Sequence, residues 1–240
     1  MTKAIILCAG MGKRLEGYLG GIPKSLIQIG EKTIIERQIE TLRNLNINEI
    51  AIVMGYNKAL LEKKLNKFVK PFWGDIDYYF NPFYETTNSI TSFWLARDFL
   101  TEDTLIINGD ILFKSEIIKR ILKIEADCCL AVDIGKYNEL GYKVQILNDE
   151  IKSMGMNISK ENTAGEYAGI SYVSERVAFY FVELLDIFMA KKMFNEWYEN
   201  TYLNIINSGI FKVSYANTNP HKWIEIDTPE DIKKAEEVFK

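Results

Sequence analysis

Short apolar runs alternate with amphipathic stretches along the first third of the chain. The runs at 3–8, 49–54 and 75–80 each have the length of a buried strand, and 33–45 and 57–68 between them carry apolar residues at helical spacing. Strand and helix alternating in this way favour a mainly parallel sheet with helices on both faces. The pattern therefore predicts an α/β, doubly wound fold.

The rest of the chain continues this pattern with one interruption. Two short segments, 143–147 and 150–154, flank a turn at Asn148-Asp149 and predict a small antiparallel insertion, so the sheet is expected to be mixed. We find no linker or repeat and expect a single domain over 1–240. The further strands are expected at 25–29, 104–108, 127–133, 165–173, 209–215 and 223–226, and the further helices at 89–100, 115–124, 174–191, 194–204 and from residue 228 onward.

A glycine turn follows the first predicted strand. Gly10 and Gly12 permit a tight turn that brings the backbone close to a ligand, and Lys13 and Arg14 come next. The segment closes with the sequence PKSL, which contains Lys24. Backbone N–H groups on a tight turn, together with basic side chains, bind anions. The segment therefore predicts a polyphosphate site.

Two common phosphate-binding loops do not fit this turn. The loop of P-loop ATPases has four residues between its glycines and then Lys-Ser/Thr, whereas one residue separates Gly10 from Gly12. The dinucleotide fingerprint has a third glycine three positions after the second, where this chain has Leu15. Neither class of nucleotide-binding protein is indicated.

Composition excludes several classes of protein. The net charge is −4, which argues against a broad basic face for nucleic acid. No apolar run reaches the roughly 18 residues of a membrane helix, so no membrane partner is expected. Cys8, Cys128 and Cys129 lack metal-ligand spacing and indicate reduced thiols in a cytoplasmic protein. His221 is the single histidine, which excludes a histidine metal cluster and a catalytic triad.

Two aspartates follow predicted strands at distant places in the sequence. Asp110 comes after the strand at 104–108, and Asp227 comes after the strand at 223–226. Ligands of open parallel sheets bind beyond the carboxyl ends of the strands, and Mg²⁺ accepts a few carboxylates together with water and phosphate oxygens. We therefore expect these aspartates to share Mg²⁺, although each alone could be a turn or helix-cap residue.

The pattern AGxGxRL followed by PKSL resembles the signature of nucleotidyltransferases, which join NTPs to phosphorylated sugars or alcohols. The usual form is close to LAAGxGxRL…PKxL, so Cys8 and Ser25 are small departures, and the spacing from Arg14 to Lys24 is somewhat compressed. The resemblance implies a Rossmann-like nucleotidyltransferase fold, with a nucleotide-binding part at about 1–112 and an acceptor-binding part at about 113–240. In this family Asp110 and Asp227 would hold the metal.

The resemblance also implies roles for other residues. Arg14 and Lys24 would be catalytic, gripping the phosphates of the NTP and the attacking phosphate. The nucleotide would be bound by Leu7, Ala9, Gly10, Gly12, Lys13, Tyr56, Asn81 and Gly109. The acceptor would be bound by Tyr84, Asn88, Ser89, Lys143, Glu166 and Trp223.

At 240 residues, the chain resembles a compact group of the family, which includes the bacterial phosphocholine cytidylyltransferases. This implies CTP, Mg²⁺ and a small phosphorylated alcohol or aminoalkylphosphonate as acceptor. A cationic head group would need aromatic faces and carboxylates, for which Tyr84, Glu85, Trp94, Glu166, Tyr167 and Trp223 are candidates. A sugar-1-phosphate enzyme using UTP, dTTP or GTP, or a non-catalytic nucleotide-binding regulatory module, stays an alternative, and a homodimer is left open.

Overall fold

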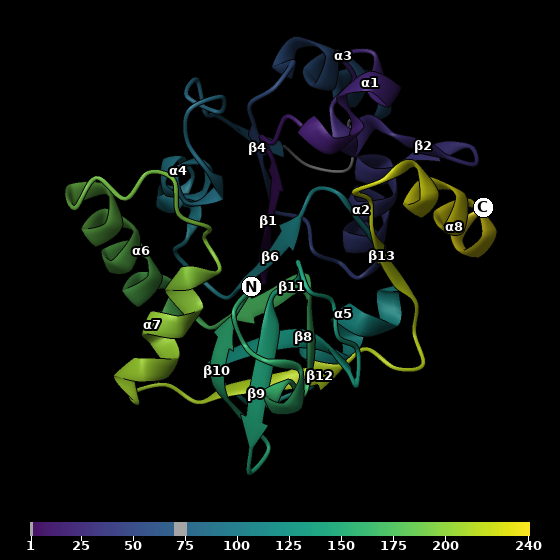
Figure 1. Cartoon of the computed structure of the whole chain (residues 1–240). Helices are drawn as coiled ribbons and strands as arrows, with labels where there is room; N and C mark the ends of the chain where they lie inside the picture. The colour runs from purple at the N-terminus through teal and green to yellow at the C-terminus, as the bar shows by residue number, and fades with distance from the viewer. Residues whose placement is uncertain (1, 70–75) are drawn as a thin grey trace.

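The computed structural model describes residues 2–69 and 76–240 and builds them around one large sheet (Figure 1). From edge to edge the strands run β10 (Glu150–Gly155), β9 (Lys143–Leu147), β11 (Gly165–Val173), β6 (Thr104–Asn108), β1 (Lys3–Cys8), β4 (Ile50–Met54) and β5 (Ile76–Phe80). Strand β8 (Cys128–Ile134) pairs with β11 and with β12 (Val213–Asn217).

The sheet is mixed, as predicted. Strands β6, β1, β4 and β5 are parallel, whereas β11 runs antiparallel to β6, β8 and β9. The hairpin of β9 and β10 is the expected antiparallel insertion. The carboxyl ends of the parallel strands meet at one edge, where ligands of such sheets bind.

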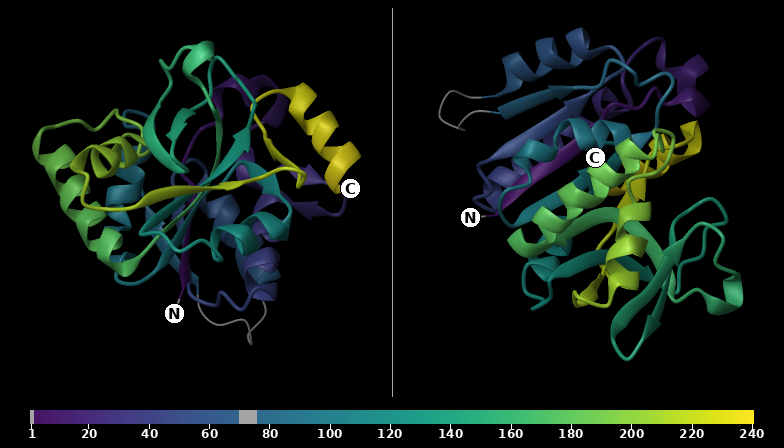
Figure 2. Two further views of the ribbon diagram at one scale, coloured as in Figure 1. Left: turned by 90° about the horizontal axis from the view of Figure 1, so that it is seen from below. Right: turned by 90° about the vertical axis from the view of Figure 1, so that its left-hand side faces the viewer.

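Helices cover both faces of the sheet (Figure 2). One face is packed by α4 (Ser89–Leu95), α6 (Glu175–Ala190) and α7 (Asn200–Ser208), which bury Phe93 and Phe181 against strand residues such as Ile5. The other is packed by α2 (Ile34–Asn44), α3 (Lys58–Phe68) and α5 (Ser115–Ile121), which bury residues including Ile39 against Ile6. Because neighbouring strand residues face opposite apolar layers, the strands are continuous apolar runs.

The two ends of the chain pack together in a third apolar cluster. It combines Leu15, which precedes α1 (Glu16–Leu19), with Ile29 of β2 (Gln28–Ile29) and Phe239 of α8 (Pro229–Phe239). Strand β2 pairs with β3 (Lys32–Thr33) in a short ribbon beneath α8. The glycine turn and the segment before α8 are thereby held on the same side of the molecule (Figure 1).

A second short ribbon lies beside the main sheet. Strand β7 (Ile111–Phe113) pairs antiparallel with β13 (Trp223–Glu225), so that Glu225 lies opposite Ile111. The backbone N–H of Ile226 donates to the carbonyl of Asp110 over 3.0 Å. This pairing joins Asp110 to Asp227, which lie more than a hundred positions apart in the sequence.

Several predicted boundaries were wrong. The strand predicted at 25–29 is only the two-residue β2, preceded by a turn of 3₁₀ helix (Lys24–Leu26), and a second such turn (Arg97–Phe99) follows α4. Helix α7 begins at Asn200 rather than at 194, because the carbonyls of Phe194 and Glu196 accept hydrogen bonds from the first turn of α4. Strand β12 begins only at Val213, since Gly209 (φ +64°) ends α7. The first residue expected for β5, Asp75, lies outside the described residues.

None of the helices in the described part of the chain combines the length and the apolar character that a membrane span requires.

Candidate active site

The glycine turn after β1 brings Lys24 to the edge of the sheet. Gly12 adopts φ +64°, and a Cβ there would lie 2.8 Å from Cγ of Lys24, so glycine meets both the conformational and the packing requirement. The backbone N–H of Leu15 closes the turn on the carbonyl of Gly12, and the buried Leu15 side chain anchors it. The basic side chains of Lys13 and Arg14 are left exposed.

Lys24 bridges the two predicted metal ligands. Its Nζ lies 3.1 Å from Oδ2 of Asp110 and 2.5 Å from Oδ1 of Asp227, and Nη1 of Arg14 lies 2.8 Å from Oδ2 of Asp227. Burial lowers the pKa of the Lys24 ammonium, but the two carboxylates more than offset this and raise it above its ordinary value. The four residues expected to carry the chemistry therefore meet at one point.

A third carboxylate, missed in the sequence, completes this cluster. Carboxylate oxygens of Asp110, Glu225 and Asp227 all lie within 4.8 Å of one another. Burial, followed by the charges of Asp110 and Asp227, raises the pKa of Glu225 to about 8. Glu225 lies two residues before Asp227 in the run WIEID, so its alternation with the apolar residues of a strand was the available signal.

The carboxylate cluster fits a divalent cation. The charges of Asp110 and Asp227 at this separation repel one another unless a positive charge lies between them, and the Lys24 ammonium supplies that charge in this structure. Magnesium is bound in proteins by a small number of carboxylates and shares its remaining positions with water and phosphate oxygens. Asp110 and Asp227, with Glu225 beside them, are the residues that would hold it.

The turn that carries Asp110 is fixed from both faces of the sheet. Nε2 of the buried Gln38 donates to the carbonyls of Asn108 and Ile111, over 2.9 and 2.8 Å. On the opposite side, the Tyr198 hydroxyl donates to Oδ1 of Asn108 over 2.9 Å. Gly109 also packs closely, since a Cβ there would lie 2.4 Å from Sγ of Cys8. The Asp110 carboxylate is thus held by a rigid support.

A family comparison agrees with this arrangement. Residues 4–171 match the model of the MobA-like NTP transferase domain, which is well over half of the chain. The chain belongs to this family. It is therefore a nucleotidyltransferase. The matched range contains the glycine turn and Asp110.

Two curated relatives cover nearly the whole chain. The CTP:phosphoglutamine cytidylyltransferase of Campylobacter jejuni is 27% identical over 96% of this chain and 97% of its own length. The choline-phosphate cytidylyltransferase of Streptococcus pneumoniae is 28% identical over 99% of this chain and 98% of its own. Among solved structures, the inositol-1-phosphate CTP transferase of T. maritima superposes with a TM-score of 0.81 at 21% identity, covering 99% of this chain and 97% of that one. The mixed doubly wound fold is that of a nucleotidyltransferase.

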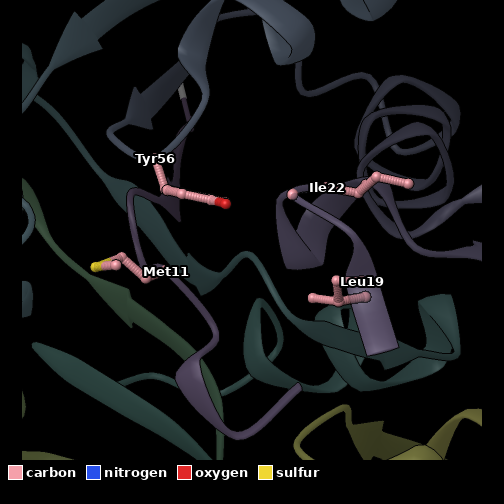
Figure 3. Close-up of a pocket in the computed structure, with 5 residues that line it drawn as sticks. Met11, Leu19, Ile22 and Tyr56 are labelled. Atoms are coloured by element: carbon pink, nitrogen blue, oxygen red, sulfur yellow. The ribbon is translucent and has the colours of Figure 1, made fainter. Parts of the chain in front are cut away.

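The residues predicted to bind the nucleotide lie around the glycine turn, with one exception. Leu7 accepts from Gly109 N–H, and Ala9 accepts from Tyr56 N–H. The Tyr56 side chain extends from the end of β4 toward the segment that contains Ile22 (Figure 3). Tyr56 and Ile22 line a small cavity together with Met11, Leu19 and Gly21. Asn81 is fully buried, and its side chain is bound to Thr87, Ser92 and the N–H of Phe83. Asn81 therefore holds the loop after β5 in place, and its side chain is not exposed to a ligand.

The residues predicted to bind the acceptor are more scattered. Asn88 caps α4, Ser89 Oγ accepts from the N–H of Tyr198, and Tyr84 packs edge-on against Tyr56. The buried ammonium of Lys143 donates to the carbonyls of Asn138 and Glu139, so it fixes a loop. These positions are not brought together at the carboxylate cluster.

Glu166 and Trp223 do lie near the carboxylate cluster. Glu166 is close enough for its charge to raise the pKa of Glu225, although burial and the two aspartates act more strongly. Trp223 lies two residues before Glu225, on the same face of β13. This side of the carboxylate cluster is therefore acidic and partly aromatic.

Glu199 is another acidic residue that sequence reasoning missed. It is buried at the start of α7; Oε1 lies 3.5 Å from Nδ2 of Asn108, while Oε2 has no hydrogen-bond partner among the described residues. Burial, more than the nearby charge of Asp110, raises the pKa of Glu199 to about 7. It adds to the acidic character of this side of the site.

Proposed function

We propose that the chain is a Mg²⁺-dependent cytidylyltransferase. It would transfer CMP from CTP to a small phosphorylated alcohol or aminoalkylphosphonate, resembling phosphocholine, and release pyrophosphate. The single observation that carries this proposal is the convergence of Arg14 and Lys24 on Asp110 and Asp227 beside the glycine turn. The names of the two full-length relatives, which both transfer from CTP to a phosphorylated acceptor, support the choice of nucleotide.

The reaction is a substitution at phosphorus. A phosphate oxygen of the acceptor forms a bond to the α-phosphorus of CTP, and the bond from that phosphorus to the bridging oxygen of the β-phosphate breaks. The electron pair leaves with pyrophosphate. Because the attacking phosphate is already ionised near neutral pH, no general base is required, which suits a site without histidine.

The residues of the site would cancel charge and align the reactants. Arg14 is more than half exposed and would turn from Asp227 to the β- and γ-phosphates, where it stabilises the leaving group. Lys24 is largely buried and would stay beside the α-phosphate and the attacking oxygen. Magnesium, held by Asp110 and Asp227, would neutralise charge on the phosphates.

A single set of assays tests the proposal. The purified protein is incubated with each NTP, Mg²⁺ and one acceptor from a panel, and pyrophosphate release is measured. Release that requires CTP together with phosphocholine or 2-aminoethylphosphonate supports the proposal. Release with a sugar-1-phosphate and UTP, dTTP or GTP would replace it by a sugar nucleotidyltransferase, and NTP binding without turnover would indicate a regulatory module.

A further inference from the structure

A lysine of the chain itself lies against an aromatic ring and a buried carboxylate next to the active site; we call these two side chains, Trp223 and Glu166, the aromatic and acidic pocket. Lys136 lies on the loop between β8 and β9, and its Nζ is 3.9 Å from the centre of the Trp223 ring. The same ammonium lies 3.1 Å from Oε2 of Glu166. The Lys136 side chain is 42% exposed, whereas that of Glu166 is 2% exposed, so the lysine reaches in from the surface.

The walls of this pocket are fixed. The indole N–H of Trp223 donates to Oδ2 of Asp133 over 3.0 Å. Oε1 of Glu166 lies 3.2 Å from Nδ2 of Asn138, and a Cβ on Gly141 would lie 2.5 Å from the same oxygen, so the loop is closely packed on the carboxylate. By contrast, the Lys136 side chain contacts Glu166 and Trp223 through its terminal ammonium, at the end of a flexible stem.

The pocket adjoins the carboxylate cluster. Trp223 and Glu225 point to the same face of β13, and Glu225 is one of the three carboxylates that lie within 4.8 Å of one another. Two residues of a strand span about 7 Å. A phosphate beside Lys24, near Asp110 and Asp227, would therefore lie about the length of a short carbon chain from the Trp223 ring.

We propose that Glu166 and the face of Trp223 bind a cationic head group of the acceptor, and that Lys136 fills this site in the free protein. The inference rests on the proposed function, because it assigns the opposite end of the same acceptor. When the acceptor binds, its ammonium replaces that of Lys136, which turns into solvent.

Charge decides in favour of a cation. When Lys136 leaves, the buried Glu166 carboxylate keeps its hydrogen bond from Asn138 but loses its ion pair, and an uncompensated buried charge is strongly destabilising, so a new cation is favoured. An anionic head group would instead meet the buried carboxylate of Glu166 and the aspartates of the adjoining carboxylate cluster. A quaternary or primary ammonium above an aromatic ring satisfies both walls of the pocket.

The test measures choline binding to the free protein by calorimetry, without nucleotide. While Lys136 fills the site, choline can bind only to the fraction of molecules in which the site is empty, and its apparent affinity is lowered by that fraction. Lys136→Met should therefore bind choline roughly tenfold more tightly than the unchanged protein. Lys152→Met serves as the matched control, because Lys152 forms an ion pair with Glu150 on the exposed hairpin. This variant should bind choline as tightly as the unchanged protein does. The neutral isostere 3,3-dimethylbutanol should bind to none of these proteins.

A second variant keeps the site charged and folded. Lys136→Arg places a planar cation that pairs with a carboxylate through two hydrogen bonds and stacks on an aromatic ring, so choline should bind several-fold more weakly. Unchanged affinity in both Lys136 variants, or equal binding of the neutral isostere, would overturn the proposal.

The choline result is independent of turnover. If pyrophosphate is released only with an uncharged acceptor and choline does not bind, the head-group site is wrong while the transferase stands. If choline binds as expected but no NTP is consumed, the proposed reaction is wrong and the cation site is retained.

Discussion

The Lys24 ammonium connects carboxylates that come from the middle and the end of the chain. It is the most buried of the basic groups at the site, and its charge separates Asp110, Asp227 and the nearby Glu225. A donor aimed at developing charge contributes more to the transition state than to the ground state. Lys24 therefore combines a structural role in the free protein with its proposed catalytic role.

Lys24→Met is expected to lower kcat/KM by roughly a hundredfold, which is the usual loss for such a donor. The variant also leaves Asp110 and Asp227 without their shared ammonium, so Mg²⁺ should raise its melting temperature more than that of the unchanged protein. Both effects are measurable, by pyrophosphate release and by thermal unfolding with and without Mg²⁺. Lys32→Met, which removes an ion pair with Glu40 on the β2–β3 ribbon, is the control. An equal Mg²⁺ response in the two variants would contradict the assignment.

Glu199 predicts a pH dependence of stability. Burial raises its pKa to about 7 in the folded protein, from an ordinary value of 4.5. The folded state therefore holds a proton that the unfolded state has lost between these values. The stability from this group is fully present below about pH 4.5 and is lost as the pH rises through about 7.

Glu199→Gln should remove this dependence. Between pH 5 and pH 7, the unchanged protein should lose stability relative to the variant by at most about 1.4 kcal/mol per pH unit. Urea unfolding at several pH values, with a chelator present, measures the difference. Glu237→Gln on the exposed side of α8 is the control. Parallel stability curves for Glu199→Gln and the unchanged protein would show that Glu199 is ionised when folded.

The sequence placed Arg14, Lys24, Asp110 and Asp227 at one site through its resemblance to nucleotidyltransferases, which the local glycine turn and the two aspartates after strands made visible. It could not find Lys136, whose contact with Trp223 depends on how a loop folds back over another part of the sheet. Asn81 was expected at the nucleotide, but a polar residue after a strand gives no indication of whether it points inward or outward.

At the level of elements, the cap of α8 fixes Asp227. Thr228 and Asp231 form a capping box, and Oδ2 of Asp231 also accepts from the backbone N–H of Asp227 over 3.2 Å. Pro229 begins the helix, as its restricted backbone favours. The sequence correctly predicted a helix from residue 228 onward, since the signal for its start is contained in four consecutive residues. It missed β7 and its pairing with β13, because three apolar residues do not distinguish a strand from a loop.

Thr228→Ala should affect both the stability of the protein and its Mg²⁺ requirement. Helix α2 has an equivalent box of Thr33 and Glu36 away from the carboxylate cluster, which offers a matched control. Loss of either threonine cap should destabilise the protein by about 1 kcal/mol. Only Thr228→Ala should also raise the Mg²⁺ concentration that gives half-maximal pyrophosphate release, because it loosens Asp227. The same Mg²⁺ dependence in both variants would mean that the cap does not position the ligand.

At the scale of the whole molecule, the site exists because the two ends of the chain meet. The third apolar cluster packs Leu15, next to the glycine turn, with Ile226 and Phe239, and the β7–β13 ribbon holds Ile226 against Asp110. The alternating pattern predicted the doubly wound sheet, and that prediction is confirmed. How the C-terminal segment returns to the first strand is a matter of tertiary packing that no single segment encodes.

This closure predicts that the two proposed metal ligands, Asp110 and Asp227, act as a unit. If Asp110 and Asp227 share Mg²⁺, Asp110→Asn and Asp227→Asn should each abolish most of the turnover, since an amide supplies an oxygen without charge. The double variant should lose little more than either single variant, because an ion misplaced by the first change gains nothing from the second ligand. CTP binding should suffer less, as Arg14 and the turn amides still contact its phosphates.

The measurement is a double-mutant cycle on kcat at saturating Mg²⁺, with folding checked by circular dichroism. Lys24 makes the single variants informative, because its ammonium contacts both carboxylates and would keep pairing with whichever aspartate remains. The folded state should therefore survive each single change. Strictly additive losses would mean that the two carboxylates act separately. An active Asp227→Asn protein would mean that Asp227 serves only to begin α8, and that the metal binds through Asp110 and Glu225 alone.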